Sequence, residues 1–288
     1  MLLAEHFVKA PNWTWYILAY FFLAGLSGGC YAIGALLRLS GRPSYEKASR
    51  VAFLAAFPLI IVCPLLLTID LGQPSKFWHM LVDSAGGGLN FKYWSPMSLG
   101  VWALGVYSGF AFLSFVGELL APVGRLLSGF LGRLVLVLGL VFGLFVGAYT
   151  GVLLSVSNQP VWSDGWPLGG LFLASGLSGA AALLLLLIPA RREEMTISLR
   201  ALGEADRYFG ILEAVLIVLF LVTVAAAGTI GKLFNLVGVL LWLLVLVGVA
   251  VPLLTHSRAR SFSPVPSSLL VLLGVLALRA VVIFGAQS

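Results

Sequence analysis

Eight long runs of apolar residues decide what this sequence can fold into. Each run is about 18 to 26 residues long, which is enough for a helix to cross the hydrocarbon core of a bilayer. A segment surrounded by lipid must satisfy its own backbone hydrogen bonds, so we expect helices and no open sheet. The predicted spans are residues 14–37, 50–69, 97–117, 132–157, 167–189, 209–228, 233–254 and 267–286.

The composition agrees with this interpretation. Hydrophobic residues make up 60% of the 288 residues and charged residues only 10%, with a mean hydropathy of +1.07. A soluble domain carries about 25% charged residues. The first twelve residues lack the apolar core of a cleavable signal, so we expect the first span to be retained. The sequence predicts an all-α integral membrane protein with one domain over residues 1–288.

Basic residues are distributed unequally between the two sets of loops. One set, with its span ends, holds five of them: Lys9, Lys76, Lys92, Lys232 and Arg279. The other set holds twelve: Arg38, Arg42, Lys47, Arg50, Arg125, Arg133, Arg191, Arg192, Arg200, Arg207, Arg258 and Arg260. Because inward-facing loops carry the basic excess, we predict both termini and the long loop 70–96 on the outer face. The net charge of +6 therefore reports orientation in a bacterial or archaeal inner membrane and does not indicate nucleic acid.

The residues that bind redox metals are scarce. His6, His79 and His256 all lie away from the middle of the spans, so no pair is placed to ligate a haem inside the bilayer. Cys30 and Cys63 are too few for an iron–sulfur cluster, which normally needs four thiolates. We interpret them as small buried hydrophobic residues, with a disulfide as the alternative. A redox role would then depend on a partner's cofactor or on a lipid-soluble carrier.

Several polar side chains are expected at one depth near the outer face. Counted along their helices, Tyr20, Tyr149 and Arg279 lie about 10 to 12 Å from the outer end, and Asp70 ends the second span there. Interpreted one at a time, Tyr20 is an interfacial tyrosine and Tyr149 a hydroxyl in a helix contact. Arg279 is then a snorkelling arginine, and Asp70 is a solvated helix end. Charged groups within a bilayer usually face the protein interior. Their shared depth therefore favours a site in the outer leaflet.

Small residues and one acid add further candidates. Close helix packing is the main interpretation of the fourfold-spaced glycines, and a narrow cleft for a flat ligand beside Tyr149 is the alternative. These glycines are Gly25 and Gly29 in the first span and Gly139, Gly143, Gly147 and Gly151 in the fourth. Glu213 lies near the inner end of the sixth span and has three interpretations. It is solvated, it is paired with Arg207, or it is the inner mouth of a proton route that includes Arg279 and Asp70.

Loop 70–96 mixes aromatic residues with few charges. Trp78, Phe91, Tyr93 and Trp94 are typical of an interfacial belt, and equally of a surface that docks a partner subunit. In the second interpretation the docking residues are Trp78, His79 and Trp94, joined by Trp162 in the turn after the fourth span.

Four stretches together resemble the NrfD/PsrC family, the membrane subunits of polysulfide reductase and related complexes. They are WTWYILAYFFLAGLSGG, DLGQPSKFWHML, YWSPMSLGVW and AYTGVLLSVSNQPVW. The resemblance covers essentially the whole chain. It implies two four-helix bundles, with a quinone bound in residues 1–157 and residues 158–288 forming the second bundle.

The resemblance also implies a function. The chain would be the quinone-reactive membrane anchor of a respiratory oxidoreductase, without haem or an iron–sulfur cluster of its own. It would exchange electrons between menaquinone or ubiquinone and a ferredoxin-like 4Fe-4S subunit, which serves a large catalytic subunit, often of the molybdopterin type. Proton translocation is an extension of this function. A secondary transporter of a small solute is the alternative, although no pair of broken helices is evident at matching positions in the two halves.

Site residues follow from the resemblance position by position. Tyr149 matches the tyrosine that hydrogen-bonds a quinone carbonyl, and Asp70 matches an acidic position suited to proton relay, so these two are the predicted catalytic residues. Tyr20 stands where polysulfide reductase has histidine and Ile17 where it has asparagine, so the headgroup contacts are expected to differ. The predicted quinone surroundings are completed by Gly147, Gly151, Ser155 and Asn158.

Overall fold

The computed structural model describes residues 11–83, 88–188, 193–256 and 264–287. Within these ranges the chain is helical and forms no strand, which confirms the all-α prediction. Eight helices are long and apolar enough to cross a membrane. They are α1 (Trp15–Leu39), α2 (Glu46–Asp70), α3 (Pro96–Leu119), α5 (Phe130–Ser155), α6 (Leu168–Leu187), α7 (Glu193–Ala226), α8 (Leu236–His256) and α9 (Pro264–Gly285). Four short helices connect them: η1 (Pro43–Tyr45), η2 (Pro74–Met80), α4 (Ala121–Leu126) and η3 (Ile230–Phe234).

The main departure from the predicted spans is the length of α7. This helix begins at Glu193, well before residue 209, because the intervening sequence is too polar for a hydropathy window to detect. The extension is nevertheless fixed to the rest of the protein. The hydroxyl of Ser198 donates a hydrogen bond to the Ser44 carbonyl of η1 at 2.8 Å, and Leu202 is buried. The α7 helix therefore extends beyond its apolar span.

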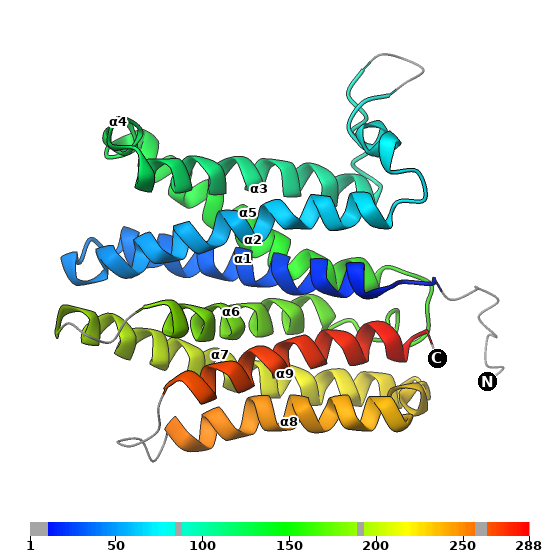
Figure 1. Ribbon diagram of the computed structural model, residues 1–288. Helices are drawn as coiled ribbons and strands as arrows, with labels where there is room; N and C mark the ends of the chain where they lie inside the picture. The colour runs from blue at the N-terminus through cyan, green and yellow to red at the C-terminus, as the bar shows by residue number, and fades with distance from the viewer. Residues whose placement is uncertain (1–10, 84–87, 189–192, 257–263, 288) are drawn as a thin grey trace.

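The transmembrane helices form two halves. Figure 1 shows α1, α2, α3 and α5 in one half and α6, α7, α8 and α9 in the other. Helix α1 lies at the junction, where it packs against α2 and α5 on its own side and against α6 and α9 across it. The spans α1, α6 and α9 are the most buried of the eight. The protein core thus lies along the seam between the halves.

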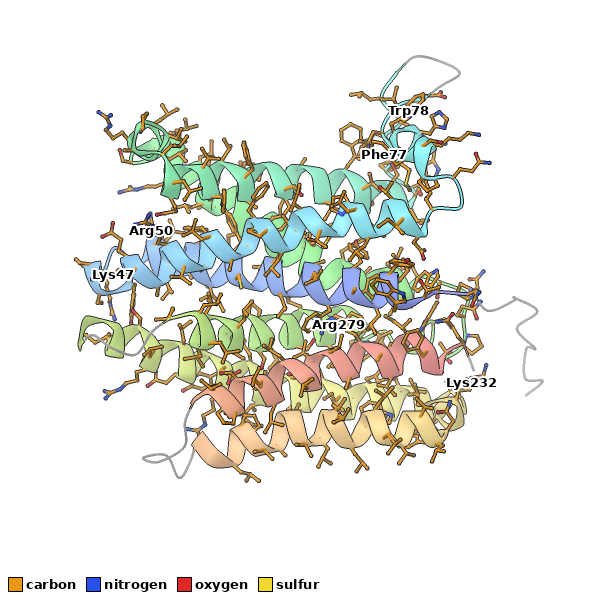
Figure 2. All side chains as sticks on the ribbon, viewed as in Figure 1. Lys47, Arg50, Phe77, Trp78, Lys232 and Arg279 are labelled. Atoms are coloured by element: carbon orange, nitrogen blue, oxygen red, sulfur yellow. The ribbon has the colours of Figure 1, made fainter. Side chains whose placement is uncertain are left out.

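The two ends of the molecule differ in character. Trp13 and Gln287 meet at one end, where the Trp13 N–H donates to the Gln287 Oε1 at 2.7 Å. The loop between α2 and α3 lies at this same end, which we call the loop end (Figure 1). Lys47 and Arg50 lie at the opposite end, which we call the basic end, whereas Lys232 lies at the loop end (Figure 2). Trp13, Gln287 and the loop between α2 and α3 thus lie on one side, as predicted, and the membrane face to which that side points stays a prediction.

Glycines allow the helices of the seam to pack backbone to backbone. A Cβ atom built on Gly28 of α1 would overlap the Gly143 carbonyl of α5, and one on Gly151 of α5 would overlap the Leu168 carbonyl of α6. Between α1 and α6, a Cβ on Gly29 would lie 2.7 Å from the Gly176 oxygen. Small residues at these positions permit close approach of the backbones. The predicted close packing is therefore confirmed at Gly29, Gly143 and Gly151.

Arg279 of α9 joins three helices inside the seam. Its side chain is fully buried, with 0% exposed. The guanidinium donates to the Phe21 carbonyl of α1 at 3.2 Å, to the Phe172 carbonyl of α6 at 3.1 Å and to the Ser175 hydroxyl at 2.9 Å. It also lies over the Phe172 ring. The snorkelling interpretation of Arg279 is therefore wrong, because the charge lies between the two halves (Figure 2).

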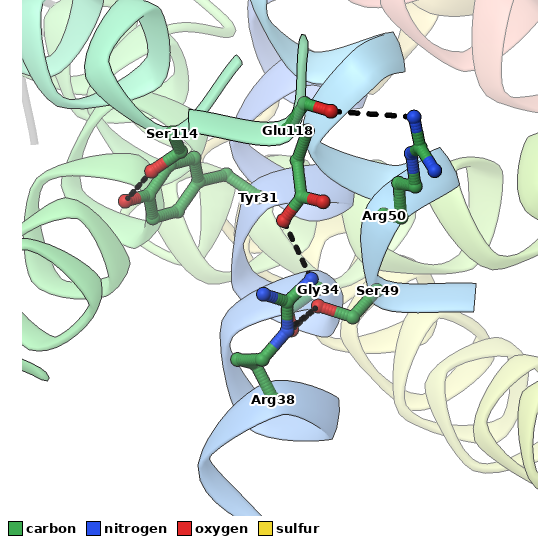
Figure 3. Close-up of polar contacts among 7 residues, drawn as sticks. All are labelled: Tyr31, Gly34, Arg38, Ser49, Arg50, Ser114 and Glu118. Carbon is green, nitrogen blue, oxygen red and sulfur yellow. Dashed lines mark hydrogen bonds and ion pairs between the residues drawn. The ribbon is translucent and has the colours of Figure 1, made fainter. Parts of the chain in front are cut away.

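A second polar cluster joins α1, α2 and α3 near the basic end (Figure 3). Arg38 forms a 2.6 Å ion pair with Glu118 of α3, and its Nε donates to the Ser49 hydroxyl of α2 at 3.2 Å. Ser49 in turn donates to the Gly34 carbonyl at 2.9 Å, and Arg50 donates to the Glu118 carbonyl at 3.3 Å. Arg38 was counted only as a basic residue that indicates orientation, but it also joins α1 to α2 and α3.

The glycine contacts predict a contrast between two substitutions. Gly28→Ala should lower the free energy of unfolding by about 1 to 3 kcal/mol, because its Cβ must push α1 away from α5. Gly105→Ala on α3 is the control, because a Cβ there has no neighbour within 4 Å. That variant should be neutral or more stable by up to about 1 kcal/mol, because alanine is the better helix former. Thermal unfolding of the two purified variants in detergent measures the difference, and equal stabilities would contradict the packing described.

Arg279 provides a second stability prediction. Arg279→Leu should lower the free energy of unfolding by about 3 kcal/mol or more, because hydrogen bonds between a charged donor and two neighbouring helices are lost. Arg279→Lys should also destabilise, because an ammonium cannot reproduce the planar fork of donors. The exposed Arg133→Gln variant is the control for loss of a positive charge. A wild-type unfolding temperature in both Arg279 variants would show that the seam does not depend on this side chain.

Candidate functional site

Tyr149 is held between α5 and the first turn of α3. Only 7% of the residue is exposed, and its hydroxyl donates to the Pro96 carbonyl at 2.5 Å. The ring stacks on Phe145 with a centroid separation of 5.6 Å and lies where a side chain on Gly100 would otherwise be. The phenol is thus fixed in place. Its proton is already engaged, so any other acceptor must displace the Pro96 carbonyl.

Tyr20 of α1 lies in the same region. It is 5% exposed, and among the described residues its hydroxyl has no hydrogen-bond partner. Its helix packs against both α2, which carries Cys63, and α5, which carries Tyr149. The Cys63 thiol also approaches the Tyr20 carbonyl at 3.8 Å. Three helices of the first half therefore bring two phenols and a thiol together, and sequence reasoning had not included Cys63.

Asp70 lies at the loop end, away from the two phenols. It is half-buried, and its carboxylate accepts a hydrogen bond from the Thr14 hydroxyl at 3.2 Å. Thr14 is the N-cap of α1, where its side chain accepts from the Tyr16 N–H. Seven residues of helix separate Asp70 from Cys63, which is about 10 Å of rise. The carboxylate is therefore placed between the phenol region and the surface, without a direct hydrogen bond to Tyr149.

The other predicted neighbours of Tyr149 have different environments. Gly147 faces Leu173 of α6, and Gly151 faces the backbone of α6, so protein atoms occupy the space beside both glycines. The Ser155 hydroxyl donates to the Val152 carbonyl at 2.9 Å, and Asn158 is exposed in the turn after α5. The geometry assigns the glycines to helix packing. A ligand contact for these four residues stays a prediction.

Glu213 and Arg279 lie in the second half. Glu213 is 1% exposed, and it interacts electrostatically with Arg279 across the space between α7 and α9. The described residues form no ion pair between Glu213 and Arg207. The solvated and Arg207-paired interpretations of Glu213 are therefore both wrong. Asp70, the third member of the predicted proton route, lies in the other half.

The loop end presents an aromatic loop surface, which we define as Phe77, Trp78, Phe91, Tyr93 and Trp94. All five side chains are exposed, Trp94 by 68%. The ring of His79 packs edge-on to Trp78 at 3.9 Å, and Tyr93 packs edge-on to Trp94. Figure 2 shows Phe77 and Trp78 at this end, beyond the helices of the first half. The surface is available for contact with another molecule.

Trp162 does not belong to this surface, which corrects the docking prediction. It is 1% exposed, its indole donates to the Val282 carbonyl of α9 at 2.7 Å, and it stacks on Trp13. The turn before it holds Val161 at a φ of 76°, with the Val161 N–H donating to the Asp164 carboxylate at 3.0 Å. This turn carries Trp162 into the core, and the sequence offered no clear signal of that conformation.

Two remaining expectations concern metals and thiols. Cys30 and Cys63 are free and buried, so the disulfide alternative is wrong. Within the described ranges, no three of the His, Cys, Asp and Glu side chains gather in a way that could hold a metal ion.

Comparison with known proteins places this geometry in a family. Residues 3–288 match the family described as polysulphide reductase, NrfD. The sequence is 31% identical to the C chain of polysulfide reductase from Wolinella succinogenes, in an alignment that spans 96% of the present protein and 94% of that relative. It is 29% identical to protein NrfD of Escherichia coli, with 99% and 97% covered.

A shorter similarity relates the protein to the C subunit of selenate reductase from Mesobacillus selenatarsenatis. The identity is 28%, over 33% of the present sequence and 20% of that relative. The family match, by contrast, spans nearly every residue, including all eight transmembrane helices. The protein therefore belongs to the NrfD family of polysulphide reductase membrane proteins.

Proposed function

We propose that this protein is the quinone-reactive membrane subunit of an oxidoreductase complex. It exchanges electrons between a membrane quinone, menaquinone or ubiquinone, and an iron–sulfur partner subunit. Two relatives are named as subunits of polysulfide and selenate reductases, which supports a reductase complex as the setting. The observation that carries the quinone role is the pair of buried phenols, Tyr20 and Tyr149, in the first half.

The phenol region fits the requirements of a quinone headgroup. Such a site needs apolar walls and a few placed hydrogen-bond donors. The Tyr20 side chain is 5% exposed and no hydrogen bond joins its hydroxyl to another described residue, so this hydroxyl is free to donate to a ligand. Tyr149 supplies a second donor, with the Pro96 carbonyl as its partner when no ligand is bound. In this proposal each phenol donates to one carbonyl of the quinone.

A bound quinone supplies two-electron, two-proton chemistry. The Tyr149 hydroxyl donates to an acceptor oxygen once it leaves the Pro96 carbonyl, and the Tyr20 hydroxyl provides the second hydrogen bond. Asp70 relays protons between the phenol region and water at the loop end, where the Thr14 hydroxyl orients its carboxylate. Both phenols are buried, which limits the access of water to them.

The aromatic loop surface is the proposed contact for the iron–sulfur partner. Aromatic residues are enriched at protein interfaces, and here they cover the end of the first half nearest the phenols. A ferredoxin-like 4Fe-4S subunit at this position brings its cluster towards Tyr20 and Tyr149. A large catalytic subunit, of the molybdopterin type, completes the proposed complex. The basic end then faces the cytoplasm and the loop end faces outward.

The transporter alternative has no specific support. Helix α2 continues through Pro58 and Pro64, and α8 continues through Pro252. The described residues therefore contain no pair of interrupted helices of the kind that forms a transport site.

Removal of one hydroxyl tests the role of Tyr149. Tyr149→Phe should lower quinol-dependent turnover of the assembled complex by roughly 10²-fold, because the hydrogen bond to the carbonyl oxygen is lost. Turnover with an artificial donor that reduces the iron–sulfur partner directly should not change. Tyr107→Phe is the matched control, because it removes a buried hydroxyl bonded to Ser27 at 2.9 Å in the same half. Equal quinol-dependent rates in the two variants would count against the proposed site.

The aromatic loop surface gives a second prediction. The double variant Trp78→Ser, Trp94→Ser should reduce the amount of partner protein that copurifies with the membrane subunit, because two exposed aromatic contacts are lost. Phe130→Ser is the control, since Phe130 is 82% exposed on α5 at the basic end. Copurification followed by iron quantification measures the effect. Full retention of the partners in the double variant would exclude this surface as the docking site.

A further inference from the structure

A small cavity lies in the second half, apart from the phenols of the first half. Its volume is about 10 Å³, which is room for roughly one water molecule. Helices α6, α7, α8 and α9 all contribute to its wall. The residues that give it polar character are Ser178, Asp206, Arg207 and Glu213, together with the backbone around Gly248 and Pro252.

The carboxyl group of Glu213 lies at the wall of this cavity with one oxygen that lacks a hydrogen-bond partner among the described residues. The residue is 1% exposed, and within the described part of the protein its Oε1 atom has no hydrogen-bond partner. An ionised carboxylate without donors is strongly disfavoured in a membrane interior. A neutral carboxylic acid needs far less solvation. The environment therefore favours the protonated form of Glu213 at rest.

The charged groups around Glu213 oppose one another. Arg279 of α9 and Asp206 of α7 are the two charged residues, of opposite sign, that act on Glu213. Arg207 is exposed at the edge of the cavity, α6 contributes Ser178, and the lining from α8 carries no ionisable group. The hydrogen bonds of Arg279 go to other residues, and none goes to Glu213. Glu213 is thus influenced by the Arg279 guanidinium but forms no hydrogen bond or ion pair with it.

The cavity extends from Glu213 towards the basic end of the molecule. Asp206 lies two helical turns closer to that end and accepts a hydrogen bond from the Ser178 hydroxyl at 3.0 Å. Arg207, the next residue, is exposed. Pro252 has no N–H and cannot donate to the Gly248 carbonyl, so the wall lacks one regular helical hydrogen bond. The polar groups Asp206 and Ser178 therefore lie between the buried acid and the exposed Arg207.

We propose that Glu213 is a proton-binding site of the second half. It carries a proton at rest and exchanges that proton with water at the basic end, through the cavity and past Asp206 and Ser178. The exchange transfers a proton between a carboxylic acid and water, and no electron moves. This site does not depend on the quinone role of the first half, and either proposal can fail alone.

Reaction with a hydrophobic carbodiimide tests the protonation state. Dicyclohexylcarbodiimide modifies protonated carboxyl groups in apolar surroundings, and peptide mass mapping locates the product. In membranes that contain the complete complex, Glu213 should be labelled at neutral pH, and labelling should fall as the pH rises. Glu118, which is ion-paired with Arg38, should stay unlabelled, and Glu213→Gln should lose the label. An unlabelled Glu213, or protection by sodium ions, would overturn the proposal.

Isotope exchange tests the route. The infrared C=O band of a protonated carboxylic acid should shift when the purified complex is transferred to D₂O, and the band should be absent in Glu213→Gln. Asp206→Asn and Ser178→Ala should each slow the shift several-fold, because both line the way to the basic end. Exchange at the wild-type rate in both variants would contradict the route, and a band that never shifts would contradict access to water.

Discussion

The buried guanidinium of Arg279 is the interaction on which the joining of the two halves depends. A cation in a membrane interior needs acceptors for its donors, and here the acceptors come from α1, α6 and α9 itself. The guanidinium reaches Phe21 only because Gly25 leaves the space open, since a Cβ there would lie 2.6 Å from it. The position of the arginine therefore depends on a glycine at residue 25.

This seam also fixes the position of the phenol region. Phe21, whose carbonyl binds Arg279, directly follows Tyr20 in α1. The register of α1 against α6 and α9 consequently determines where Tyr20 lies relative to Cys63 and Tyr149. On its other side Arg279 interacts with Glu213. One buried cation thus lies between the proposed quinone site of the first half and the proposed proton site of the second.

The sequence predicted the elements of the fold better than their contacts. Hydropathy located all eight helices, because the bilayer demands long apolar runs, but it missed the polar start of α7 at Glu193. The fourfold spacing of glycines correctly indicated close packing. The sequence did not predict the long-range hydrogen bonds. Tyr149 and Pro96 are 53 residues apart, and Arg279 and Phe21 are 258 apart.

The candidate site, like the fold, was predicted only in part. Depth along each helix placed Tyr20 and Tyr149 at one level, and both side chains are buried in the first half. The burial of Trp162 depended on the left-handed conformation of Val161, which no residue type signalled. Cys63 contacts Tyr20, 43 residues away, and Ser178 contacts Asp206, 28 residues away, and both contacts depend on how consecutive helices pack against each other.

Photo-crosslinking with a photoreactive quinone tests the central claim most directly, because it locates the headgroup without relying on activity. After irradiation of native membranes, peptide mapping of this protein should find adducts near Tyr20 on α1, near Cys63 on α2, or near Pro96 and Tyr149 where α3 meets α5. Unmodified quinone in excess should suppress these adducts. Adducts confined to α6, α7, α8 and α9 would contradict a quinone site in the first half.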